Sequence, residues 1–128
     1  MTLADIYAAV HSQDGPAKPD VADRIRQEAL RSPVAFASFL RSVPLNDTCA
    51  LFEVYEVLLQ DSKRFSEVLL SEFTHLLKRA EADPHNASIY AQLDAFALAQ
   101  DDELKASMAV VLAESLRSSE PQIRRFAA

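Results

Sequence analysis

Residues 47–60 read DTCALFEVYEVLLQ, and this stretch decides the fold. In a helix of about 3.6 residues per turn, its apolar side chains would cover more than half of the circumference. Those side chains are Leu51, Phe52, Val54, Tyr55, Val57, Leu58 and Leu59. Only Glu53, Glu56 and Gln60 form a polar strip. A helix with so little polar surface must be covered on at least two sides, so we expect it to be the central element of the fold.

The rest of the composition favours an all-α protein. The chain of 128 residues is long enough for one domain with its own core, and we expect a single domain over residues 1–128. Gly15 is the only glycine, whereas tight β-hairpins and phosphate-binding loops depend on glycine at positions with positive φ. The sequence therefore argues against dinucleotide and P-loop folds and predicts no cofactor.

Charge is unevenly distributed along the chain. Residues 1–45 carry five acidic and five basic side chains, whereas residues 46–128 carry fourteen acidic and eight basic ones. The formal net charge of −6 therefore comes entirely from residues 46–128. Because binding to phosphate depends on Lys and Arg, this balance disfavours nucleic acid and anionic membranes as partners. It is compatible with a basic protein partner.

The single cysteine and the N-terminus indicate the compartment. Cys49 has no second cysteine to pair with, so an internal disulfide is excluded. The first ten residues, MTLADIYAAV, lack the basic start and the apolar length of a signal peptide. No stretch approaches the roughly 20 apolar residues of a membrane span. These features predict a reducing, cytoplasmic location.

Apolar periodicity and capping residues predict seven or eight helices. Residues 1–45 form N-terminal helices and residues 46–128 form antiparallel helical hairpins. The expected helices cover residues 2–11, a segment from 19, and then 33–42, 47–60, 62–81, 84–99, a segment from 101 or 102, and a segment from 121. We expect Leu30 and Val34 to lie on the inner faces of the second and third helices, and Ala97 on the inner face of the sixth.

The spacing of the helix starts suggests a repeat. From Asp47 to Asp83 is 36 residues, and from Asp61 to Asp101 is 40, a length typical of two-helix repeats. Residues 121–128, PQIRRFAA, resemble the second-helix motif of HEAT repeats, with a polar cap, an aliphatic–Arg pair and small residues. This resemblance, which covers residues 46–128 at most, implies a short α-solenoid of the HEAT or armadillo type. The alternative is an irregular helical bundle.

Few residues suggest chemistry. Cys49 lies in the first turn of a helix but no histidine is placed beside it, so we interpret it as a small buried or inert side chain. Glu72 and His75 form a single Glu-x-x-His, half of the pattern found in di-iron bundles. Since Glu72 falls within the apolar arc of residues 62–81, we expect it to be buried and paired with an arginine or a tyrosine hydroxyl. Neither pattern predicts a catalytic or metal site.

The polar strip is the favoured binding surface. Glu53, Glu56 and Gln60, with Asp94 from a helix one unit further on, are the predicted partner-binding residues. They favour a non-catalytic protein-interaction module with an acidic surface, such as a small inhibitor, an immunity protein or an adaptor that binds a basic partner.

Three alternatives stay open at this point. One is a helical-bundle enzyme or metal-binding protein that uses Glu72, His75 or a pocket near Tyr55 and Tyr90. Another is an N-terminal fragment of a longer helical scaffold. A third, compatible with the favoured interpretation, is a homo-oligomer that forms through the C-terminal segment.

Overall fold

A computed structural model describes residues 5–8, 19–43 and 48–127, with the side chains of residues 48–50 outside the description. Its described residues are helical or in turns, and the all-α prediction is confirmed. After a helical turn at residues 5–8 come α2 (Pro19–Arg31), α3 (Pro33–Ser42), α4 (Thr48–Leu59), α5 (Ser66–Ala82), α6 (Ala87–Ala95), the 3-10 helix η1 (Phe96–Leu98), α7 (Asp102–Ser115) and α8 (Pro121–Ala127). The predicted number of helices agrees with this order.

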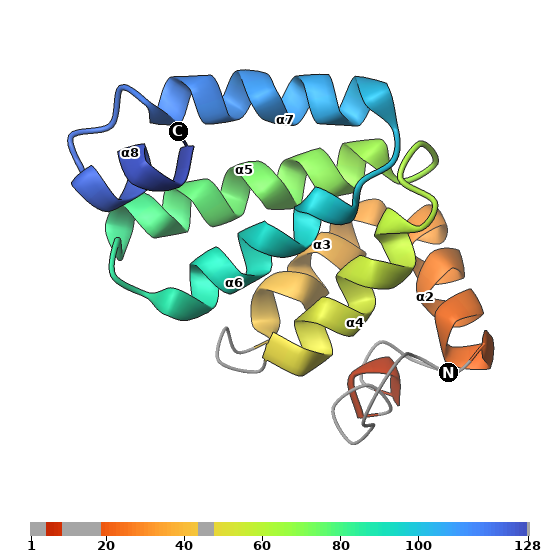
Figure 1. Ribbon diagram of the computed structural model, residues 1–128. Helices are drawn as coiled ribbons and strands as arrows, with labels where there is room; N and C mark the ends of the chain where they lie inside the picture. The colour runs from red at the N-terminus through yellow and green to blue at the C-terminus, as the bar shows by residue number, and fades with distance from the viewer. Residues whose placement is uncertain (1–4, 9–18, 44–47, 128) are drawn as a thin grey trace.

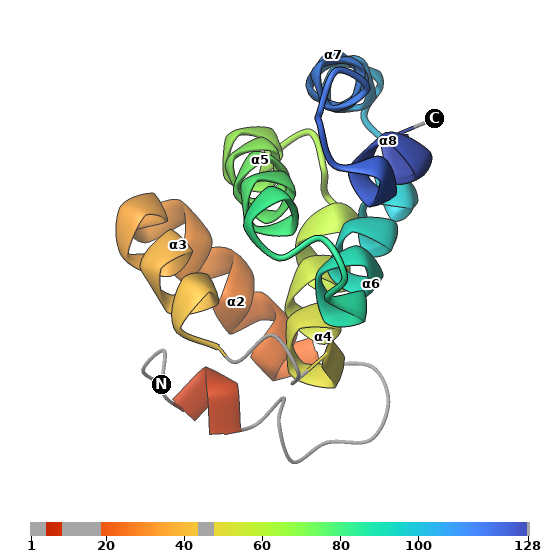
Figure 2. The same ribbon diagram turned by 90° about the vertical axis from the view of Figure 1, so that its left-hand side faces the viewer.

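The helices pack in two rows. Helix α4 contacts α2 and α6, whereas α5 contacts α3 and α7, so from α2 to α7 the helices touch the second one along the chain. Figure 2 shows α3, α5 and α7 in one row and α2, α4 and α6 in the other. In Figure 1, α5 and α7 run in the same direction, and α6, which comes between them in the sequence, runs in the opposite direction below α5. This arrangement is compatible with stacked hairpins, and membership of a HEAT-like repeat stays a prediction.

Helix α4 lies at the centre, as its composition predicts. Six of its seven predicted apolar side chains are buried, namely Leu51, Val54, Tyr55, Val57, Leu58 and Leu59, whereas Phe52 is 38% exposed. The Phe96 ring lies 5.2 Å from the Tyr55 ring and 5.3 Å from the Phe73 ring, measured between centroids. These tilted aromatic contacts join α4, α5 and η1 in one cluster, which extends from Ile6 to Ile123.

Several helix starts differ from the prediction. Helix α7 begins as expected, because the Asp101 carboxylate accepts a hydrogen bond of 3.0 Å from the Leu104 amide. Helix α5 begins at Ser66, not residue 62. Buried Ser62 instead uses its Oγ to accept hydrogen bonds from the Gln100 and Asp101 amides, at 3.1 and 2.8 Å. A residue that resembles a local cap thus joins two connections that are distant in sequence.

Helix α6 is shorter than the predicted span of 84–99. It begins after Asn86, whose side chain accepts a hydrogen bond from the Ser88 amide, and it continues as η1 after Ala95. The tighter winding of a 3-10 helix changes which residues share a face. Phe96 points into the core, whereas Ala97 is exposed, and the predicted inner position of Ala97 is wrong.

Two apolar residues predicted to be buried are exposed. The exposed fraction is 44% for Leu30 and 82% for Val34. In a helix, Val34 lies roughly 120–180° from Phe36, Leu40 and Val43, the buried residues of the same segment. Leu30 is similarly displaced from Val21 and Ile25. The predicted inner positions of both residues are wrong, because these apolar side chains lie on the opposite side of their helices from the buried ones.

Candidate functional site

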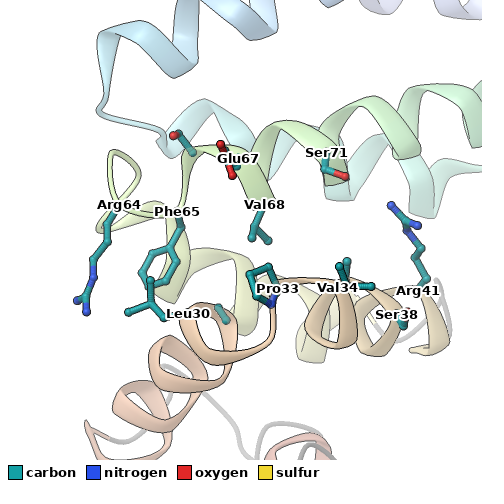
Figure 3. A pocket seen from close by; sticks show the side chains of 13 residues that line it. Leu30, Pro33, Val34, Ser38, Arg41, Arg64, Phe65, Glu67, Val68 and Ser71 are labelled. Carbon is teal, nitrogen blue, oxygen red and sulfur yellow. The ribbon is translucent and has the colours of Figure 1, made fainter.

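An apolar groove runs between α3 and the start of α5. Its volume is 620 Å³, and residues from the end of α2, from α3 and from residues 64–71 line it. The exposed side chains of Leu30 and Val34 contribute its apolar surface, together with Pro33, Phe65 and Val68. Figure 3 shows Pro33 and Val34 on the α3 side facing Val68 on the α5 side. An exposed valine inside a groove is the kind of surface that a partner can cover.

Cationic side chains stand at the two ends of this groove. Arg64 lies at one end, with its guanidinium carbon 5.6 Å from the centroid of the Phe65 ring. Arg41 lies at the other end and points toward α5 (Figure 3). Glu67 is the only acidic residue among the residues that line the groove. The groove is therefore apolar along its middle and mainly cationic at its ends.

A second hollow continues the groove along α5. It has a volume of 540 Å³ and shares Arg41, Glu67 and Ser71 with the groove. Leu70, Thr74, His75 and Lys78 complete its lining. Burial, with the nearby charges of Arg41, Arg79 and Lys78, lowers the pKa of His75, so this imidazole is neutral at pH 7. Lys78 adds another cation to this face of an acidic protein.

Glu72 is buried beside the end of the groove where Arg41 lies. Its side chain is 2% exposed, and its Oε1 lies 3.4 Å from Nε of Arg41, whose side chain remains 42% exposed. The Tyr55 hydroxyl is near enough to the Glu72 carboxyl for the two groups to shift each other's pKa. The prediction that Glu72 is buried beside an arginine and a tyrosine is confirmed. Its placement ties α3, α4 and α5 together.

The pKa values of Glu72 and Tyr55 are both raised in this cluster. Burial raises the pKa of the Glu72 carboxyl, and the Arg41 guanidinium and the Tyr55 hydroxyl offset part of that rise. Burial and the neighbouring Glu72 carboxylate raise the pKa of Tyr55. Tyr55 therefore stays protonated at physiological pH and serves as a hydrogen-bond donor, not as a base.

The predicted partner-binding residues lie on two adjacent helices. Glu53 and Glu56 on α4 are half-buried, whereas Gln60, just beyond α4, is exposed. Asp94 is exposed on α6, which packs against α4. The four residues therefore belong to one row of helices. None of the four residues lines the groove between α3 and α5.

Glu72 and His75 belong to no larger group of metal ligands within the described residues. No group of three or more His, Cys, Asp or Glu side chains there is placed to hold a metal ion. Tyr55 is buried in the aromatic cluster, whereas the Tyr90 hydroxyl donates to the Pro84 carbonyl and Tyr90 lines a hollow with Gln122, Arg125 and Phe126. The side chain of Cys49 lies outside the described residues.

The C-terminal segment packs on its own chain. Ile123 is fully buried, and the Phe126 ring lies 5.4 Å from the Tyr90 ring, measured between centroids. Arg124 donates a hydrogen bond of 2.7 Å to the Ser118 carbonyl, and Arg125 reaches Gln122 at 3.5 Å. Contact of this segment with a second copy stays a prediction.

Sequence reasoning missed the groove, although a signal for it was present. Leu30 and Val34 lie off the apolar arcs of their helices, and an apolar residue on the polar side of an amphipathic helix indicates an exposed patch. Nothing in the sequence indicated that these two residues lie beside Arg64 and Val68, which are thirty or more positions away from them.

Comparison of the chain with protein-family models, curated proteins and solved structures finds no match. None of the described helices is both long and apolar enough to cross a membrane. The groove between α3 and α5 and the acidic residues on α4 and α6 are the two candidate binding surfaces.

Proposed function

We propose that this protein is a non-catalytic protein-interaction module, of the inhibitor, immunity or adaptor kind, that binds a segment of its partner in the groove between α3 and α5. The observation that carries the proposal is Val34, which is 82% exposed inside a groove with apolar walls. Covering a valine side chain contributes about 1.5–3 kcal/mol when it becomes fully buried. A binding surface of this kind needs no catalytic group.

The acidic surface is the second candidate. Gln60 and Asp94 are exposed on adjacent helices, with Glu53 and Glu56 half-buried beside Gln60. A basic protein that binds this surface would associate faster at low salt, because steering between opposite charges is screened by ions. The groove is favoured over this surface because it combines exposed apolar area with a concave shape.

A pull-down with three baits distinguishes the two surfaces. The baits are the wild type, Val34→Gln and the double variant Glu53→Lys/Glu56→Lys, each followed by mass spectrometry of captured proteins. Val34→Gln is not expected to disturb folding strongly, because Val34 is exposed. If the groove is the binding surface, partners are lost with Val34→Gln and retained by the double variant. The reverse pattern identifies the acidic surface.

Metal analysis of the purified protein tests the enzyme alternative. A non-catalytic module should contain no stoichiometric iron, manganese or zinc. If one of these metals is present at one equivalent and is lost in the Glu72→Gln/His75→Ala double variant, the proposal is wrong. That result would favour a metal-binding helical protein.

A further inference from the structure

The charges around the groove are opposite in sign to the charge of the whole molecule. The chain has a formal charge of −6, yet the groove and the adjoining hollow are lined by Arg41, Arg64 and Lys78 with Glu67 as their only exposed acid. Glu72 balances part of the Arg41 charge, but it does so from below, at 2% exposure. A partner that enters this groove therefore meets cations at its edges.

We infer that the groove receives an amphipathic helical segment of another protein, with apolar side chains packed on Leu30, Val34 and Val68 and carboxylates paired with Arg41, Arg64 and Lys78. This inference builds on the proposed function and adds the chemistry of the partner. It reverses the charge predicted from the whole chain, from which a basic partner was expected.

The dimensions and walls of the groove suit a helix. The side of α5 from Ser66 to Lys78 extends about 18 Å at 1.5 Å per residue, which corresponds to roughly three turns of a bound helix. The part of this length between α3 and the start of α5 is apolar, and the part toward Lys78 is polar apart from Leu70. An amphipathic helix presents apolar and polar side chains of this kind to a groove. Apolar residues of the partner at positions i, i+3, i+4 and i+7 would face Val34, and its acids would lie on either side.

Charge complementarity favours a carboxylate-bearing protein segment over nucleic acid. The cations stand at opposite ends of an apolar surface and do not form the continuous basic track that follows a phosphate backbone. Asp61 also lies 3.6 Å from Arg64, and Glu67 projects from the same side of the groove, so a closely spaced phosphate chain would meet carboxylates. Separate carboxylates on a helix can avoid them.

A displayed peptide library tests the inference. The library consists of 16-residue peptides with apolar residues fixed at helical spacing. All remaining positions are randomised. It is selected on the wild-type protein at physiological salt after depletion on Val34→Gln. We expect the enriched peptides to carry an excess of Asp and Glu. No excess, or an excess of Lys and Arg, would overturn the inference.

Two variants then locate the charge dependence. For an enriched peptide, Arg64→Gln/Lys78→Gln should raise the dissociation constant by about 3- to 10-fold, because each exposed ion pair contributes roughly 0.2–1 kcal/mol to binding. Arg117→Gln, an exposed arginine on another part of the molecule, is the matched control and should leave binding unchanged. Equal effects of the two changes would contradict pairing at the groove.

The outcomes separate the inference from the proposed function. If the selected peptides depend on Val34 but show no preference for acidic residues, the groove is still a binding surface, and only the inference of an acidic partner is wrong. If no peptide depends on Val34, both the groove and the inference are wrong. An oligonucleotide that binds the wild type and is lost in Arg64→Gln/Lys78→Gln would likewise overturn a protein partner at this surface.

Discussion

Glu72 shows how one residue can join several elements at an energetic cost. Glu72 is on α5, and its buried carboxyl lies close to Arg41 on α3 and to the Tyr55 hydroxyl on α4. Burying a charged pair gains Coulomb energy but loses hydration, so such pairs often add little net stability. The same contacts restrict how the three helices can pack. Glu72 therefore contributes more to the geometry of this junction than to the free energy of unfolding.

Stability should fall as pH rises through the titration of Glu72. The pKa of this group is raised in the folded state above its ordinary value of 4.5, so the folded protein binds more protons than the unfolded chain between the two values. The wild-type free energy of unfolding should decline relative to that of Glu72→Gln as pH increases above about 4.5, by at most about 1.4 kcal/mol per pH unit.

Urea denaturation of both proteins across this pH range measures the difference. The two stability curves should diverge over the interval from the ordinary to the raised pKa and run parallel above it. A constant difference throughout would show that the Glu72 carboxyl does not change its pKa on folding.

Ser62 should be more important for stability than its size suggests. Its side chain is 3% exposed and accepts hydrogen bonds from two backbone amides of the connection between η1 and α7. Ser62→Ala removes the acceptor and leaves both donors unpaired, so we expect a loss of about 1–3 kcal/mol in urea denaturation. Ser119→Ala, at an exposed position, should change stability by less than about 0.5 kcal/mol. Equal losses would contradict the proposed role.

At the scale of the element, helix ends are determined by which side chain meets the free amides. The first turn of α7 is preceded by Asp101 and contains Asp102, and either carboxylate could cap the helix by sequence alone. The structure assigns the cap to Asp101, whereas Asp102 is fully solvated and lies 3.9 Å from Lys105. At α5, by contrast, Phe65 occupies the N-cap position without a side-chain hydrogen bond. Tertiary packing starts that helix without a local cap.

The two aspartates before and within α7 should therefore differ in their contribution to stability. Asp101→Ala removes the hydrogen bond to the Leu104 amide, and we expect it to cost about 0.5–2 kcal/mol. Asp102→Ala loses only a weak surface ion pair and should cost less than about 0.5 kcal/mol. Thermal or urea denaturation of the two variants measures both values. If Asp102→Ala costs as much as Asp101→Ala, the helix dipole and not the cap dominates.

At the scale of the whole molecule, the order of helix contacts sets how a local change spreads. Helices of the two rows contact helices one or two positions away along the chain, and α8 packs against α7 at one end. In a stack, removal of a contact at one end should leave the other end intact. In a bundle around one shared core, the same removal should weaken every helix together.

Hydrogen exchange in two truncation variants distinguishes these architectures. Ile123→Ala and Leu40→Ala each remove a buried side chain, at opposite ends of the helix order, and each should cost about 2–5 kcal/mol. For a stack, Ile123→Ala should speed amide exchange mainly in α7 and α8, and Leu40→Ala mainly in α2 and α3. Uniform acceleration from α2 to α8 in either variant would favour the irregular bundle.

The sequence by itself determined the all-α class, the central position of α4 and the burial of Glu72, because each follows from local information. Apolar side chains at helical spacing, proline at Pro33 and Pro121, and an acid inside an apolar arc all act within a few residues. Helix starts were predicted well where a side chain caps its own helix, as at Asp101, and poorly where the cap candidate bonds elsewhere, as at Ser62.

Only the tertiary structure decided the groove. It requires Leu30 and Val34 from one hairpin to face Arg64 and Val68 from the next, and helical periodicity carries no information on how two helices are positioned side by side. The acidic strip was visible in the sequence because its members share one helix face. The cationic ends of the groove were not visible in the sequence, because Arg41 and Arg64 border the same groove only when α3 packs beside α5.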